Sequence, residues 1–299
     1  MNITVLYGGP SAEREVSLVS GRAVAQGLRD AGHTVTEVDV RPETLADALA
    51  KLADVVFPVL HGTWGEDGTL QTELEKRGIK FVGSGSVASR LGMNKVDTKR
   101  AWEAAGLPTP PYRIVTSDSD PIPQEACVVK AIDSGSSVDV YVCKGQAEGV
   151  VQPVDAVRRV LANHSAALVE KFIAGPELTV GLLEEKALAP IRIVPKVEFF
   201  DYEAKYKRAD TEHRFDTGLP AELVETCQRL AERANAIVGA RDLARVDIMI
   251  DGATNQPFLL EINTLPGFTP KSLLPEAAAH AGVPFAKLVD RLVRRAAAR

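Results

Sequence analysis

The sequence lacks the features that mark secreted, membrane and nucleic-acid-binding proteins. Its three cysteines, Cys127, Cys143 and Cys227, have neither the even number of a disulfide framework nor the spacing of a metal site. It has no apolar run of 18 residues and no signal-peptide pattern, so we expect a cytoplasmic protein without a membrane partner. A formal net charge of -5 argues against a nucleic-acid partner, because binding to phosphates needs a basic surface.

What the N-terminal part does contain is an alternation of strand and helix patterns. Strands are expected at residues 3–7, 34–40 and 55–60, with helices between them and another helix after residue 68. This order predicts an open parallel sheet with flanking helices, whose ligands bind beyond the C-terminal ends of the strands. Residues 8–13 fall there but lack the Gly-x-Gly-x-x-Gly fingerprint, which argues against a dinucleotide-dependent oxidoreductase.

Two side chains near these strand ends have both a structural and a functional interpretation. Glu13 stands at the start of a helix predicted to run to Asp30, where a carboxylate stabilises the helix dipole. In a crevice at the end of the sheet it could instead bind a substrate ammonium group. The structural interpretation of His61 is a loop residue packed on Trp64.

The middle of the chain predicts a helix over residues 94–105 that carries Lys95, followed by a proline cluster at residues 106–112 that suggests a domain boundary. A hairpin is expected over residues 127–143, with Lys130 ending its first strand and a Gly/Ser tip that suits phosphate binding. Cys127 and Cys143 alternate with valines in the two strands, which indicates small core residues.

Further strands are expected at residues 167–173 and 177–183, and helices at residues 223–238 and 276–299. Glu170 and Glu177, on the two strands, are either charges on edge strands or a pair that brackets an adenosine. Residues 199–218 are rich in charge and poor in apolar periodicity, a long loop of the kind that is usually functional or disordered.

The stretch with the clearest chemistry is a β-hairpin over residues 245–263. If Ile250 pairs with Phe258, then Asp247 lies opposite Glu261 and Arg245 lies opposite Asn263. Period-2 geometry then places Phe258, Leu260 and Ile262 on one face of the second strand. Facing carboxylates are destabilising unless a cation lies between them. Two carboxylates and an amide oxygen suit Mg²⁺, with water and nucleotide phosphates completing its shell. A hairpin with one solvated face is the alternative.

Four long motifs, in the same order, strongly resemble those of D-alanine–D-alanine ligases, a family of the ATP-grasp superfamily. They are GGPSAEREVS at residues 8–17, LHGTWGEDGTLQ at 60–71, DYEAKY at 201–206 and EINTLPG at 261–267. The resemblance covers almost the whole chain. It implies an α/β fold, α+β in the ATP-grasp part, with an N-terminal open parallel sheet with flanking helices followed by two ATP-grasp subdomains. We expect these domains at residues 1–92, 93–182 and 183–299.

The resemblance also implies a role for individual residues. Asp247, Glu261 and Asn263 would hold Mg²⁺, with two ions expected and Mn²⁺ as an alternative, and ATP phosphates would contact Lys95, Lys130, Ser137 and Lys205. The adenosine would contact Glu170, Lys171, Ile173 and Glu177. Glu13 and His61 would bind the first D-alanine, Ser272 and Leu273 the second, and Arg245 and Gly267 the oxyanion. Glu13, Ser136 and Tyr206 would form a hydrogen-bonded set that ties a lid to the N-terminal domain.

The implied reaction joins two D-alanines to D-alanyl-D-alanine for peptidoglycan, through an acyl phosphate formed with ATP. A carboxylate is a poor electrophile, so phosphoryl transfer activates it, and this transfer depends mostly on positioning and electrostatics. The oxyanion formed by amine attack needs donors such as Arg245 and the Gly267 N–H. A homodimer is implied by the family alone, and no general base is evident from the residues.

The chain departs from the usual family pattern near several of these positions. Around Lys130, Ala131, Ser134 and Asp139 replace Pro, Glu and Gly; elsewhere the departures are at residues 217–218, 242–244 and 270–271. An inward Asp139 would add negative charge beside the phosphates. The metal and phosphate ligands are intact, so the departures bear on the lid and on the second substrate. The alternatives are a ligase of the same fold with another acceptor (D-lactate, D-serine or another amino acid) and a non-catalytic nucleotide-binding homologue.

Overall fold

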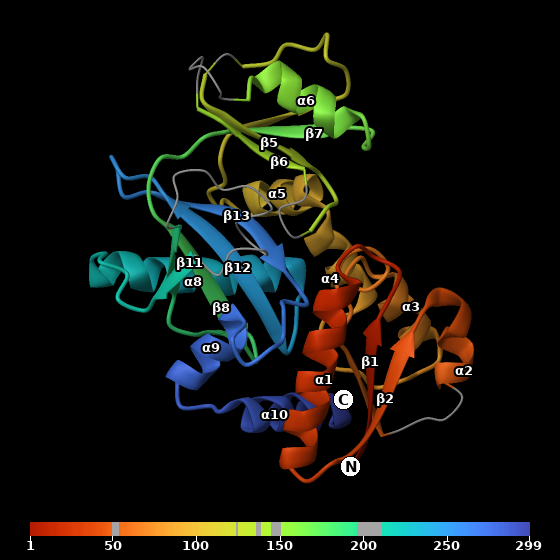
Figure 1. Cartoon of the computed structure of the whole chain (residues 1–299). Helices are drawn as coiled ribbons and strands as arrows, with labels where there is room; N and C mark the ends of the chain where they lie inside the picture. Colours follow the sequence, from red (N-terminus) through yellow and green to blue (C-terminus); the bar gives the residue numbers. More distant parts are fainter. Residues whose placement is uncertain (50–53, 124, 136–138, 145–150, 196–210) are drawn as a thin grey trace.

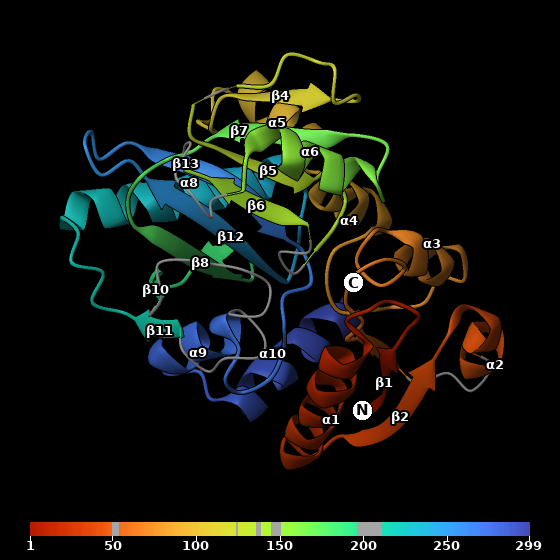
Figure 2. The ribbon, with the colours of Figure 1, turned by 45° about the horizontal axis from the view of Figure 1, so that its top comes forward.

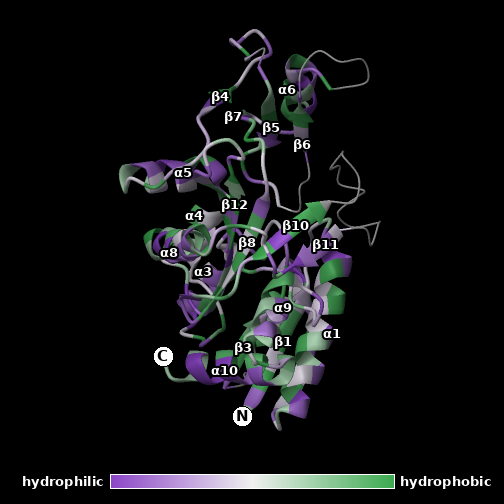
Figure 3. Cartoon of the chain, turned by 90° about the vertical axis from the view of Figure 1, so that its left-hand side faces the viewer, coloured by the Kyte–Doolittle hydropathy of each residue, from purple (hydrophilic) through white to green (hydrophobic). Residues whose placement is uncertain are grey.

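The computed structural model describes residues 1–49, 54–123, 125–135, 139–144, 151–195 and 211–299, and the structural statements below concern these residues. Three β-sheets with their covering helices are stacked in three tiers (Figures 1 and 3). Both ends of the chain lie in the tier formed by the N-terminal sheet (Figure 1). Within the described part of the chain, no helix combines the length and the apolar character needed to span a bilayer.

The N-terminal sheet is parallel with the order β2-β1-β3, which confirms the predicted open parallel sheet. Its strands are β1 (Asn2–Gly8), β2 (Thr34–Val40) and β3 (Val55–Pro58). The helices that cover it are α1 (Arg14–Asp30), α2 (Leu45–Leu49), α3 (Thr69–Lys76) and α10 (Phe285–Ala297), with a short 3₁₀ helix at Pro42–Thr44. The helix α10 comes from the far end of the sequence.

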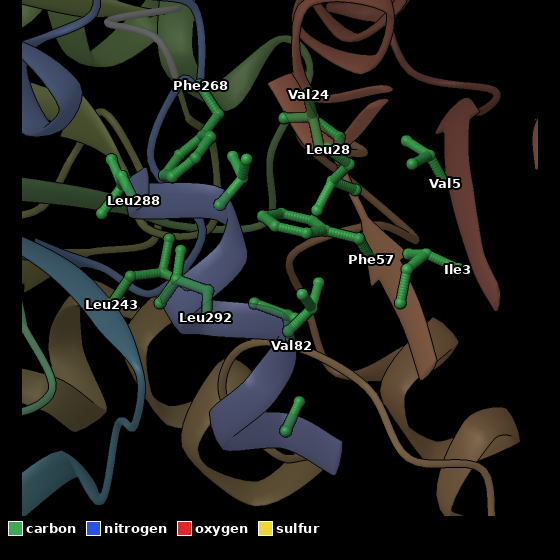
Figure 4. Packing of buried hydrophobic residues seen from close by; sticks show 14 of the residues in the cluster. Ile3, Val5, Val24, Leu28, Phe57, Val82, Leu243, Phe268, Leu288 and Leu292 are labelled. Carbon is green, nitrogen blue, oxygen red and sulfur yellow. The ribbon is translucent and has the colours of Figure 1, made fainter. Parts of the chain in front are cut away.

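Both faces of this sheet are buried, as expected for parallel strands that alternate with helices. Val5 of β1 belongs to a core shared with Leu28 of α1 and Leu292 of α10 (Figure 4). The next residue, Leu6, points to the other face and packs in a core that includes Leu70 and Leu74 of α3. The strand period of two therefore divides β1 between two separate cores.

Two helices, α4 (Ser86–Met93) and α5 (Lys95–Ala104), lead to the second sheet. Asn94 begins α5, and its side chain accepts a hydrogen bond of 3.0 Å from the Asp97 N–H, a typical N-cap. The helix predicted over residues 94–105 is confirmed. Trp102 on α5 is fully buried in the core of the third sheet, so this helix packs on the C-terminal part of the chain.

The second sheet is antiparallel with the order β4-β7-β5-β6 (Figure 2). Its elements are β4 (Tyr112–Val115), β5 (Cys127–Ala131), β6 (Val140–Cys143), α6 (Pro153–Leu161) and β7 (Ala167–Lys171). Cys127 lies opposite Cys143 in the predicted hairpin, and both thiols are buried in the core with α6, as expected. The face turned away from α6 carries Lys130 and Glu170.

The third sheet is also antiparallel, with the order β11-β10-β8-β12-β13 and with β9 paired to β8. Its strands are β8 (Glu177–Leu183), β9 (Lys186–Ala187), β10 (Ile191–Pro195), β11 (Thr211–Arg214), β12 (Leu243–Ile250) and β13 (Pro257–Asn263). The helix α8 (Ala221–Val238) covers one face with apolar residues such as Leu230 and Val238. The two antiparallel sheets confirm the α+β prediction for this part of the chain.

The arrangement of the sheets bears on the domain boundaries. The predicted boundary at residues 182–183 falls inside β8, which pairs with β10 and β12 of the third sheet. We propose a boundary between β7 and β8 instead. We keep residues 1–92 as the first domain, with the addition that α10 packs onto it from the C-terminal end.

Residues 276–299 end in a basic helix, as predicted, but they do not form one continuous helix, because α9 (Leu273–His280) and α10 are separate. Gly282 has a positive φ of 79°, which ends α9, and Pro284 begins α10. Apolar residues continue across this break and conceal it in the sequence pattern.

Candidate active site

The hairpin of β12 and β13 has the predicted register at the four polar residues of the candidate metal site. Asp247 lies opposite Glu261, and Arg245 lies opposite Asn263. The pairing of Ile250 with Phe258 is wrong: Ile250 lies opposite Pro257, because the register shifts by one residue between Asp247 and Ile248.

This β-bulge changes which side chains of β13 face the core. Leu259 and Ile262, three residues apart, are both buried under α8, whereas Phe258 and Leu260 are only partly buried. The predicted grouping of Phe258, Leu260 and Ile262 on one face is therefore wrong, since an extra residue in one strand breaks the period of two. The bulge lies directly beside the two facing carboxylates, a position typical of functional sites.

Cationic side chains of the protein lie beside the facing carboxylates. Arg245 donates to Asp247 through Nε at 3.0 Å and Nη2 at 2.8 Å, and the Thr179 hydroxyl donates to Asp247 at 2.6 Å. Lys95 Nζ is 3.8 Å from Glu261 Oε2, and Arg245 Nη2 is 4.0 Å from Glu261 Oε1. Arg245 and Lys95 therefore offset part of the repulsion between the two carboxylates.

The donor set nevertheless fits a hard divalent cation. Glu261 presents a half-buried carboxylate next to Asn263, whose Oδ1 accepts a 2.8 Å hydrogen bond from the Leu265 N–H. The described residues include no cluster of three or more His, Cys, Asp or Glu suited to a metal. Two carboxylates and one amide oxygen are too few for a complete shell, which agrees with a Mg²⁺ site completed by water and phosphates.

A second charged group lies at the C-terminal ends of the first sheet. Glu13 precedes α1 but makes no capping hydrogen bond with its side chain. His61 is buried, and its Nδ1 lies 3.0 Å from Glu66 Oε1, while its Nε2 has no hydrogen-bond partner among the residues that the structure describes. Burial, with repulsion from Glu66, raises the pKa of Glu13 to about 7. Glu13 therefore exchanges a proton in the neutral range, which a surface carboxylate at a helix start would not do.

These two groups line one cleft, together with residues of the glycine-rich tip. Its lining includes seven residues predicted for the site: Glu13, His61, Lys95, Arg245, Glu261, Asn263 and Gly267. Gly135 of the tip approaches Glu13 so closely that a Cβ there would lie 3.4 Å from Oε2. Lys95 Nζ donates to the Ser134 carbonyl at 2.6 Å. The cleft therefore joins residues from all three sheets and their loops.

Deeper between the second and third sheets lies a third charged group. Glu170 is fully buried and forms ion pairs with Lys130 through Oε2 and with Lys99 through Oε1. Both β7 and β8 are interior strands, so the interpretation of Glu170 and Glu177 as edge-strand charges is wrong. Of the two predicted residues that follow Glu170 closely in the sequence, Ile173 is buried and Lys171 is exposed.

The residues predicted for the second substrate stand at the start of α9. Ser272 occupies the N-cap position, Leu273 is the first helical residue, and the Ser272 hydroxyl accepts a 3.0 Å hydrogen bond from the Thr269 N–H. A Cβ on Gly267 would lie 3.4 Å from Ser272 Oγ, so this glycine is next to them. Ser136, Ser137, Lys205 and Tyr206 lie outside the described residues.

Two departures from the usual pattern have a clear structural role. Asp139 has a φ of 53°, a conformation that favours glycine, and its carboxylate is 3.0 Å from His164 Nε2 and 3.2 Å from the Tyr141 hydroxyl. It therefore points to Tyr141 and to the loop after α6. Asp242 is fully buried and accepts hydrogen bonds from the Gly83 N–H, Arg295 and Arg299. It joins the first sheet to α10.

Two residues of the site escaped prediction, although each had a signal. Glu66 stands within the second motif, five residues after His61, but acidic loop residues are common and we gave it no role. Lys99 stands four residues after Lys95 on α5, so the two share a helix face.

Comparison with known proteins agrees with this geometry. Residues 101–294 match the family model described as D-ala D-ala ligase C-terminus, and residues 40–84 match the one described as D-ala D-ala ligase N-terminus. The D-alanine–D-alanine ligase of Geotalea uraniireducens is 42% identical over 302 residues, 99% of this chain and 95% of the relative. The chain belongs to the D-alanine–D-alanine ligase family.

Other members of the D-alanine–D-alanine ligase family agree in extent and fold. The enzyme of Gluconobacter oxydans is 41% identical and is covered over its full length. The crystal structure of the Bacillus anthracis ligase has a TM-score of 0.85 at 31% identity, with coverage of 99% of this chain and 97% of that one. The same ligase complexed with ATP has a TM-score of 0.84 at 30% identity and the same coverage.

Proposed function

We propose that this protein joins two D-alanines to D-alanyl-D-alanine with ATP, for peptidoglycan synthesis. The observation that carries the proposal is the single cleft in which Glu13 and His61 meet Lys95, Arg245 and Glu261. A carboxylate suited to an ammonium group thus faces side chains suited to phosphate and metal. Membership of the ligase family supports the same conclusion.

At the nucleotide end, Lys95 and Lys130 would contact the ATP phosphates, and Glu170, Lys171, Ile173 and Glu177 would line the adenosine pocket. Burial lowers the pKa of Lys95, with Glu261 opposing that shift, whereas Glu170 and Glu261 outweigh burial and raise the pKa of Lys130. Asp247, Glu261 and Asn263 would hold Mg²⁺, or Mn²⁺ in its place, at up to two positions. The bound ion would spread the charge of the phosphates during transfer.

At the substrate end, Glu13 would bind the ammonium group of the first D-alanine, with His61 beside it. The carboxylate of that D-alanine takes the γ-phosphoryl group of ATP, which leaves ADP. The amine of the second D-alanine attacks the resulting acyl phosphate, and inorganic phosphate leaves as the peptide bond forms. Arg245 and the Gly267 N–H would stabilise the oxyanion. The bidentate pairing of Arg245 with Asp247 fixes the guanidinium plane beside the cleft.

Ser272 and Leu273 would bind the carboxylate of the second D-alanine at the start of α9, where backbone N–H groups favour an anion. By family resemblance, Ser137 and Lys205 would add phosphate contacts, while Ser136 and Tyr206 would link the lid to Glu13. We further propose a cytoplasmic homodimer, the state implied by the family.

The deciding experiment measures ADP release by the purified protein with ATP, Mg²⁺ and a panel of D-amino and D-hydroxy acids. Release that depends on D-alanine alone, with D-alanyl-D-alanine as the product, is the expected result, and L-alanine serves as the control. Release that requires D-lactate or D-serine beside D-alanine would assign another acceptor. Nucleotide binding without any release would indicate a non-catalytic homologue.

A further inference from the structure

Lys99 is a fully buried lysine for which the proposed reaction has no task. It lies on α5, one turn after Lys95, and none of its side chain is exposed. Its Nζ contacts the Glu170 carboxylate and the Thr109 hydroxyl and lies 5.6 Å from the centre of the Tyr112 ring. Burying an ammonium group is costly, so a lysine in this position needs a compensating partner.

That partner is a carboxylate that already has a second cation. Glu170 forms ion pairs with Lys99 through Oε1 and with Lys130 through Oε2, and all three side chains are almost completely buried. Burial alone would raise the pKa of Glu170, but Lys130 and Lys99 together hold that pKa below its usual value. Glu170 is therefore an anion shared by two lysines.

The proposed function, on which this inference rests, makes two demands on Lys130. In this structure its Nζ lies against Glu170, but a contact with the ATP phosphates requires the same ammonium group. When Lys130 turns to the phosphates, Glu170 loses one of its two cations. A buried carboxylate left without any cation would oppose that movement, because removing one partner of a buried pair is strongly destabilising.

We propose that Lys99 is a positioning residue for ATP, which keeps Glu170 neutralised while Lys130 binds the phosphates. The helix α5 supplies one lysine to each of two sides of the proposed nucleotide site. Lys95 reaches Ser134 and Glu261 on the phosphate side, and Lys99, one turn later, reaches Glu170 on the adenosine side. The contact with Thr109, whose hydroxyl donates to the Leu259 carbonyl of β13, fixes Lys99 to the third sheet.

The test compares the affinities of the full-length protein for ATP and for adenosine, by calorimetry with Mg²⁺ and without D-alanine. Adenosine has no phosphates to bind Lys130, so Lys130 stays at Glu170. The phosphates of ATP bind Lys130, which then leaves Glu170. In Lys99→Met we therefore expect the Kd for ATP to rise on the order of 10- to 100-fold and that for adenosine to rise less than about threefold. Lys99→Arg, which keeps the charge, should stay close to the wild type. Arg100→Met removes a neighbouring, exposed charge on α5 and serves as the matched control.

An equal loss of affinity for ATP and adenosine in Lys99→Met, or no loss at all, would overturn the proposal. If Lys99→Met is unstable, Lys99→Gln replaces it in the same comparison, because its amide can still donate to Glu170 and Thr109 but carries no charge. The proposal predicts a selective loss of affinity for ATP in Lys99→Gln, and an unchanged ratio of the two affinities would contradict it. A wild type that shows this ATP selectivity but no D-alanine-dependent ADP release would count against the ligase function only.

Discussion

Glu13 and Glu170 are two largely buried carboxylates at opposite ends of one site, and their surroundings give them opposite charge behaviour. Glu13 has another carboxylate, Glu66, as a neighbour, and burial and this repulsion raise its pKa to about 7. Glu170 has two lysines, which overcome burial and lower its pKa. The same residue type thus serves as a group that titrates in the neutral range and as a permanent anion.

In the proposed function, the difference follows from what each carboxylate would bind. A substrate ammonium group brings its own positive charge, so Glu13 needs no resident cation and would be blocked by one. The nucleotide of the proposed function brings no cation to Glu170, so the protein supplies its own, Lys99 from α5 and Lys130 from β5. Glu261 lies between these cases, within 4.0 Å of both Lys95 and Arg245.

The largest effect is expected when the carboxylate of Glu261 is removed. Glu261→Ala should lower kcat on the order of 10²–10³-fold, because a developing charge loses its electrostatic stabilisation. It should also abolish the Mg²⁺ dependence of nucleotide affinity, which calorimetry with and without Mg²⁺ measures. Glu225→Ala, on an exposed face of α8, is the control. Unchanged Mg²⁺-dependent turnover would refute the role of Glu261.

The next effect separates the substrate end from the nucleotide end. Glu13→Gln keeps the shape of the side chain but removes the charge, so the KM for the first D-alanine should rise about 10- to 100-fold. The affinity for ATP should be unchanged. Steady-state kinetics with each substrate varied would measure both, with the exposed Glu15→Gln as a control. An unchanged D-alanine dependence would remove Glu13 from the substrate site.

A smaller effect tests why the pKa of Glu13 differs from that of Glu170. Glu13 must be ionised to bind an ammonium group, so kcat/KM for the first D-alanine should rise with pH through a midpoint near 7. Glu66→Gln removes the repulsion, lowers the pKa of Glu13 and should move this midpoint down by about 0.5 to 1 pH unit. Glu73→Gln, at a partly buried position on α3, should leave the pH profile of kcat/KM unchanged. A midpoint that stays in place would show that burial alone sets the pKa.

The smallest effect concerns a carboxylate that points away from the site. Asp139→Gly relieves the positive φ but loses the contacts with His164 and Tyr141, so the free energy of unfolding should change by less than about 1 kcal/mol. Asp139→Ala loses the same contacts without relieving the backbone and should destabilise the fold by about 1–2 kcal/mol. Chemical denaturation measures both. If Asp139→Gly lowers the KM for ATP, then the carboxylate of Asp139 does face the phosphates.

The sequence predicted most of what local patterns determine. The strands around Val5 and Val38, the helix carrying Lys95 and the pairing of Asp247 with Glu261 follow from periodicity, capping and turns. The β-bulge after Asp247 was not predicted, because no residue type around it marks the register shift that turns both Leu259 and Ile262 to the core under α8. The break at Gly282 was hidden because both flanking segments are helical.

Site residues could be predicted from the family resemblance or from strand pairing. Residues whose charge behaviour depends on burial could not. Lys99 resembles an ordinary exposed lysine of a helix, and only its contact with Glu170 from another sheet shows otherwise. Glu66 likewise matters through its effect on the pKa of Glu13, which depends on how deeply both are buried.

The position of α10 has a consequence for how the protein is made. Leu288, Leu292 and Val293 of α10 complete the core beneath β1 and β3, although they follow every other described helix and strand in the sequence (Figure 4). A nascent chain that has emerged only as far as β13 therefore lacks part of the apolar cover of Ile3, Val5 and Phe57. The core of the N-terminal sheet is completed only after α10 has been synthesised, so contacts between distant parts of the sequence must form late.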